Sequence, residues 1–84
     1  MEKEEFINRL KNIVGKYAQN HEALASINER TDFINDLKIN SANLVDVVLD
    51  IEEEFDITIE NEAMEKMLNV GISIEVIEER MKGK

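Results

Sequence analysis

The side chains that could do chemistry gather around one serine. Ser41 begins the amphipathic segment 41–55, where its hydroxyl is predicted to act as an N-cap and accept an orphan backbone N–H. That hydroxyl would be exposed beside the positive end of the helix dipole, which favours an anion attached there. By itself an N-cap serine indicates only capping, so the surroundings of Ser41 must decide what it does.

Nucleophilic catalysis and metal binding find little support elsewhere in the chain. His21 is the only histidine and lies in a predicted polar loop, so a Ser/His/Asp arrangement would depend on a solvated side chain. The absence of cysteine excludes disulfides, zinc–thiolate sites and thiol catalysis. The acids of residues 46–56 follow helical spacing and lack the glycine of an EF-hand loop. No metal site and no catalytic residue is therefore predicted.

Negative charge is concentrated in the middle of the chain. The net charge is −9, and no Lys or Arg lies between Ile39 and Glu65. On a helical wheel of about 100° per residue, three acids of segment 41–55 point away from its core stripe: Asp46, Asp50 and Glu53. Such a field disfavours nucleic acid and anionic membranes and steers a basic protein partner. The alternative is a solvated face that serves solubility.

Three apolar residues of the same segment lie off its core stripe. They follow a second line beside the acids, at spacings i, i+3 and i+7: Ala42, Val45 and Leu49. An apolar strip edged by carboxylates is typical of a docking surface for a partner helix or groove. The alternative is that the preceding long loop covers Val45 and Leu49.

The elements that position these residues are predicted to be helices, because the chain has no proline and only three glycines. Apolar spacing predicts four of them. They cover about residues 2–18, 41–55, 60–68 and 70–81. The short third helix is expected to bury Ala63, Met64, Met67 and Leu68. The fold class is all-α: a small four-helix bundle with a long loop between helices 1 and 2.

The connection over residues 19–40 is expected to be pinned onto the core by apolar side chains, with Thr31 or Asp32 capping a short turn. With 84 residues, the chain is expected to form one domain, 1–84, around one core. Its charged N-terminus lacks the apolar block of a secretory signal, and no apolar run approaches a membrane span. We therefore expect a cytoplasmic protein.

Two motifs frame the Ser41 segment. A Phe-x-x-Asp-Leu sequence at residues 33–37 approaches the serine, and the Glu-Glu-Glu-Phe run of residues 52–55 ends the amphipathic segment. At this spacing, the region from Phe33 to about Leu68 resembles the acyl carrier protein family, and both terminal segments resemble it more loosely.

The resemblance implies a four-helix bundle whose serine, here Ser41, is esterified by 4′-phosphopantetheine. A phosphopantetheinyl transferase would supply that group from coenzyme A, and its thiol would carry acyl groups as thioesters. The protein would be a monomeric carrier without catalytic activity of its own. It would serve enzymes of fatty acid or related acyl or polyketide biosynthesis.

The resemblance also implies that the acidic second helix docks onto basic patches of partner enzymes. By position, the partner-binding residues would be Asn40, Ala42, Val45, Asp46, Leu49, Asp50 and Glu53. The usual Asp-Ser-Leu motif is Asn-Ser-Ala here, so a carboxylate beside the modified oxygen is missing. This departure fits a specialised carrier. The alternatives are an acidic helical adaptor without a prosthetic group and an aminoacyl or peptidyl carrier of the same fold.

Overall fold

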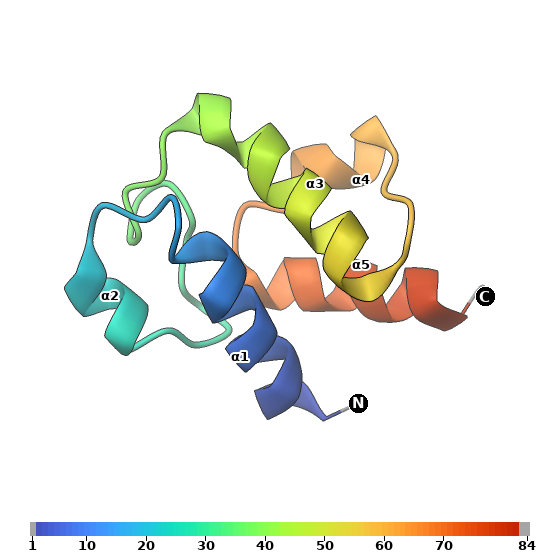
Figure 1. The fold of residues 1–84 in the computed structure, drawn as a ribbon, viewed down its shortest axis with the longest axis horizontal. Coiled ribbons are helices and arrows are strands. Elements are labelled where there is room, and N and C mark those ends of the chain that lie inside the picture. Colours follow the sequence, from blue (N-terminus) through green and yellow to red (C-terminus); the bar gives the residue numbers. More distant parts are fainter. Residues whose placement is uncertain (1, 83–84) are drawn as a thin grey trace.

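The computed structural model describes residues 2–82, and within that range the chain is helical with no strand (Figure 1). The helices are α1 (Lys3–Val14), α2 (His21–Ala25), a 3₁₀ turn (Ser41–Asn43), α3 (Leu44–Phe55), α4 (Asn61–Lys66) and α5 (Val70–Lys82). The predicted all-α bundle is confirmed. Helix α1 packs against both α3 and α5, while α2 lies at the end of the bundle opposite the C-terminus.

Helix α1 follows its predicted pattern but ends earlier than predicted. Two acids occupy its first turn and a lysine its last, as the helix dipole favours. Its inner face buries Phe6, Leu10, Ile13 and Val14. Beyond Val14 the backbone tightens into turns, in which the N–H groups of Tyr17 and Ala18 both donate to the Val14 carbonyl. The predicted continuation to residue 18 is therefore a compact turn that keeps Ala18 in the core.

The long connection contains a helix that was not predicted. Helix α2 has five residues, too few to show an apolar period, and none is fully buried, although Ala23 and Leu24 pack partly against the core. His21 begins this helix rather than lying in a loop. Its one local signal is Asn20, whose side chain accepts the Ala23 N–H at 3.2 Å. Further on, Asp32 caps a turn as predicted, because its carboxylate accepts the N–H groups of Ile34 and Asn35.

The core gathers the inner faces of α1, α3 and α5 around the apolar residues of the connection, Phe33, Leu37 and Ile39. Rings of Phe6 and Phe55 join α1 to α3 with centroids 5.7 Å apart. The prediction that Leu68 is buried is wrong, since the side chain is 45% exposed. Helix α4 ends at Lys66, so Leu68 lies in a turn to which the helical period no longer applies.

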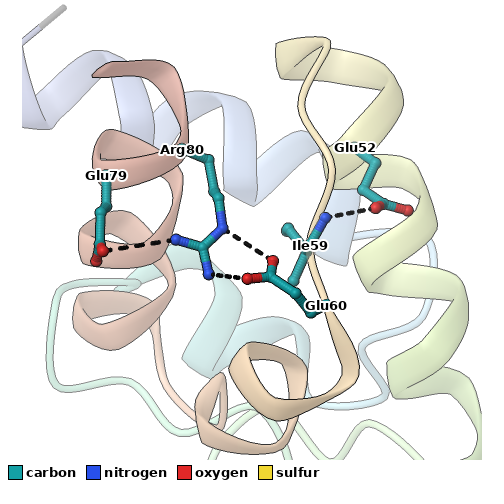
Figure 2. A network of polar contacts seen from close by, with 5 residues as sticks. All are labelled: Glu52, Ile59, Glu60, Glu79 and Arg80. Atoms are coloured by element: carbon teal, nitrogen blue, oxygen red, sulfur yellow. Dashed lines mark hydrogen bonds and ion pairs between the residues drawn. The ribbon is translucent and has the colours of Figure 1, made fainter. Parts of the chain in front are cut away.

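Polar side chains of α3 and α5 hold the start of α4 from two sides (Figure 2). Glu52 of α3 accepts the Ile59 N–H at 2.7 Å, just before α4. Arg80 of α5 donates to both carboxylate oxygens of Glu60, at 3.0 and 2.7 Å, and also lies 3.6 Å from Glu79. A hydrogen bond from its own backbone N–H, and then Arg80, hold the pKa of Glu60 below its usual value.

Loss of this ion pair is expected to loosen α4 selectively. In Arg80→Gln, the α4 amides should exchange hydrogen a few-fold faster than in the wild type, whereas the α1 amides should change little. Because the pKa of Glu60 is lower in the folded state, ionised Glu60 contributes to the stability of the folded protein. This contribution is fully present above the ordinary glutamate pKa and is lost as the pH falls through the lowered value. Lys82→Gln, which removes a charge from the same helix, is the control. Equal effects of both variants would contradict the prediction.

Ser73 gives a second expectation about stability. Its side chain is fully buried, and its hydroxyl has no hydrogen-bond partner among residues 2–82. Because an unsatisfied buried hydroxyl destabilises and alanine favours helix, Ser73→Ala should raise the free energy of unfolding by about 1 kcal/mol. Urea unfolding followed by circular dichroism measures this. Ser26→Ala, which removes a hydroxyl that donates to the Glu22 carbonyl, should give no gain. A loss of stability in Ser73→Ala would contradict the expectation.

Candidate functional site

Ser41 lies where the long connection enters α3, in the 3₁₀ turn that precedes the helix. The predicted position of the helix start is confirmed, but the predicted N-cap role of Ser41 is wrong. Asn40 is the cap: its backbone is extended, its side chain accepts the Ala42 N–H at 2.9 Å, and its carbonyl accepts the Asn43 N–H. Ser41 already lies inside the turn, one residue past the position from which a side chain can cap it.

The capping by Asn40 leaves the Ser41 side chain available. Ser41 is exposed, and within residues 2–82 its hydroxyl makes no hydrogen bond. The segment before it is fixed, because Ile39 is buried and its N–H donates to the Phe33 carbonyl at 3.0 Å. Lys38, with φ 57°, makes the left-handed turn that brings the chain out to the surface. The hydroxyl is thus free, but its backbone is anchored.

The apolar strip on α3 is open to solvent in the structure. Val45 is 49% exposed and Leu49 is 53% exposed, and Ala42 is exposed beside them. The alternative that the long loop covers Val45 and Leu49 is wrong. Large apolar side chains that remain this exposed mark a surface suited to contact with another molecule. The strip begins next to Ser41, at the end of α3 that projects from the bundle in Figure 1.

Of the three acids predicted to point into solvent, two do so and one contacts the bundle. Asp46 and Glu53 are exposed and make no hydrogen bond or ion pair to any residue of 2–82. Asp50 is 25% exposed; it accepts the Tyr17 hydroxyl at 2.8 Å and lies 3.8 Å from the Lys16 ammonium. The hydrogen bond to Asp50 is the main cause that raises the pKa of Tyr17. One of the three carboxylates, that of Asp50, therefore binds to the turn after α1.

Other acids of α3 also serve internal contacts that the helical wheel did not indicate. Glu54 lies 3.3 Å from the Arg9 guanidinium, which also lies over the Phe55 ring at 5.6 Å from its centroid. Glu52 is bound to the Ile59 N–H, as described above. These partners come from α1 and from the turn before α4, so only the packing of the elements could show them.

The site offers an accessible hydroxyl rather than an activated nucleophile. Its side chain has no hydrogen bond to a base in the part of the chain that the structure describes. In the same part, no group of three His, Cys, Asp or Glu side chains is placed to hold a metal ion. None of the described helices is both long enough and apolar enough to cross a membrane.

Comparison with known proteins agrees with this geometry. The family model described as "Phosphopantetheine attachment site" matches residues 8–71. An acyl carrier protein from Lactobacillus acidophilus is 37% identical over 78 residues, covering 92% of this chain and 94% of the relative. One from Thermotoga maritima is 30% identical over 79 residues, covering 94% and 95%.

A solved structure shows the same fold. The acyl carrier protein from Enterococcus faecalis matches with a TM-score of 0.75 at 24% identity, over 95% of this chain and 99% of that one. The family match covers the 3₁₀ turn, α3 and α4, and the relatives span nearly the whole chain. The chain therefore belongs to the acyl carrier protein family and contains its phosphopantetheine attachment domain.

Proposed function

We propose that Ser41 carries the 4′-phosphopantetheine group and that the protein delivers acyl thioesters to enzymes of fatty acid or related acyl or polyketide biosynthesis. The observation that carries this proposal is the exposed, unpartnered hydroxyl at the entrance to α3. It lies inside the region matched by the attachment-site family. The protein itself would act as a cytoplasmic, monomeric carrier without catalysis.

The residues around Ser41 fit an attached phosphodiester. The 3₁₀ turn and α3 follow one another directly, so their N-terminal end presents positive dipole charge to a phosphate on Ser41. No lysine, arginine or bulky side chain adjoins the serine in sequence, which leaves room for an arm to swing. When bound, the group supplies the thiol that a chain without cysteine lacks.

The surface beside Ser41 suits brief contacts with several enzymes. Exposed apolar groups and free carboxylates share one side of the 3₁₀ turn and α3: Ala42, Val45, Leu49, Asp46 and Glu53. Carboxylates in water steer a basic patch on approach and add little to affinity, which suits serial transfer. We propose this surface, with Asn40 at its edge, as the docking site for the phosphopantetheinyl transferase and for acyl-modifying enzymes.

One observation favours a second candidate, an acidic adaptor that carries no prosthetic group. Asn40 stands where the family has an aspartate, so the carboxylate that assists the transferase and its metal is absent. The adaptor would use the same α3 surface. It differs from the carrier in one measurable property, because protein isolated from its native host would have only the mass encoded by its sequence.

Loading of Ser41 is the direct test. With a broad-specificity phosphopantetheinyl transferase and coenzyme A, the intact mass should rise by one phosphopantetheine group, and Ser41→Ala should abolish the gain. Ser26→Ala removes another exposed serine hydroxyl and should load like the wild type. A gain that survives in Ser41→Ala would refute the assignment, and a complete absence of loading in the wild type would favour the adaptor.

Restoring the family's carboxylate should accelerate loading. Asn40→Asp keeps an oxygen that can accept the Ala42 N–H, so the cap should persist and the thermal midpoint should stay close to the wild-type value. The added carboxylate should raise kcat/KM for the transferase several-fold through its metal. Asn43→Asp adds the same charge three residues away and serves as the control. Equal rates for Asn40→Asp and the wild type would contradict this role of the carboxylate.

A further inference from the structure

Two aspartates one turn apart on α3 have different surroundings. Asp46 is exposed and has no hydrogen bond or ion pair within residues 2–82. The Asp50 carboxylate accepts the Tyr17 hydroxyl at 2.8 Å and lies 3.8 Å from the Lys16 ammonium. The turn after α1 makes its direct contacts with Asp50, whereas Asp46 acts on Tyr17 only through its charge, a lesser cause of the raised pKa of Tyr17.

Asp50 also lies at the margin of the docking surface. At about 100° per residue, Asp50 is about 40° around α3 from Asp46, whereas Leu49 and Val45 lie about 60° and 100° away on the other side. The apolar strip and Asp50 are therefore on opposite sides of Asp46. A partner centred on the strip would meet Asp46 and Glu53 before Asp50.

The local charges make Asp50 a poor docking group. Its carboxylate already receives a hydroxyl hydrogen and faces a cation, so a partner's cation would gain little by approaching it. The same cation would also meet Lys16, whose side chain is 67% exposed and repels it. The Tyr17 hydroxyl and the Lys16 ammonium thus favour a contact of Asp50 within the bundle over a contact with a partner.

We propose that Tyr17 is a positioning residue that withdraws Asp50 from the docking surface, so that Asp46 and Glu53 are the acids of α3 that a partner reads. This inference rests on the proposed carrier function. The partner that fits is an enzyme whose basic patch covers the Asp46 side of α3 and places no cation opposite Lys16. Tyr17 thereby sets which basic surfaces can dock.

A matched pair of variants tests the proposal. Asp46→Asn and Asp50→Asn each remove one negative charge from the same helix, so the long-range field changes by a similar amount. Asp46→Asn should lower kcat/KM for loading by the transferase about two- to five-fold at low salt, as expected for an exposed ion pair. Asp50→Asn should change it less than about twofold. A loss in Asp50→Asn equal to that in Asp46→Asn, or no loss in either variant, overturns the proposal.

Tyr17→Phe is the complementary variant. Loss of the Tyr17 hydroxyl should release Asp50, raise kcat/KM for loading by the transferase about twofold and make this rate constant more dependent on salt. The gain should vanish in the double variant Tyr17→Phe/Asp50→Asn. If Tyr17 had a purely structural role, Tyr17→Phe would change kcat/KM equally in the wild type and in Asp50→Asn, and that result would overturn the proposal. Lys16→Gln provides a second route, because removal of the cation should also raise the rate.

The hydrogen bond between Tyr17 and Asp50 can be tested in the isolated protein, without a partner enzyme. Tyr17 is the only tyrosine and the chain has no tryptophan, so ultraviolet titration reports this hydroxyl alone. Asp50→Asn should lower the tyrosine pKa clearly more than Asp46→Asn does. Failure of the wild type to load refutes the carrier function, whereas normal wild-type loading with equal effects of the two aspartate variants refutes only the inference. Equal tyrosine titrations in the two variants also overturn it.

Discussion

One helix must bury one face in a small core and leave another face open, and the rest of the molecule is arranged around that constraint. Helix α3 places Val47, Val48, Ile51 and Phe55 in the core. Its other side keeps Val45 and Leu49 in water, an arrangement that folding alone does not favour. The apolar area left exposed is available for burial against a partner, and the neighbouring carboxylates help to orient that encounter.

The position of Ser41 depends on the residues just before it. Ile39 is buried and Asn40 caps the 3₁₀ turn, so the serine is held by its backbone while its hydroxyl is left free. A fixed anchor defines where a flexible arm would start, which suits the role proposed for Ser41. Ser41 lies within the region matched by the attachment-site family, and its free hydroxyl supports the proposed attachment there.

Acids of α3 that look alike in the sequence differ in the structure, because some make polar contacts with other elements and others stay exposed. Asp50 contacts Tyr17 and Lys16. Glu54 pairs with Arg9, and Glu52 accepts the Ile59 N–H. These acids help to join α3 to its neighbours, and others remain for recognition. The short helix α4 is tied to α3 and α5 by two such contacts at its start (Figure 2).

Local patterns in the sequence determined where α1, α3, α4 and α5 lie, which face of α3 is buried, and which serine stands in the turn before α3. These features follow from apolar periodicity and motif spacing, which are properties of neighbouring residues. The caps by Asn20 and Asn40 are local side-chain contacts that apolar periodicity does not reveal. Packing decided that Leu68 is exposed and that Ala23 and Leu24 of α2 are partly buried against the core. Packing also brought the Tyr17 hydroxyl within hydrogen-bond distance of Asp50. A periodicity assigns a side chain to a face, but its hydrogen-bond partner comes from whichever distant segment the fold brings beside it.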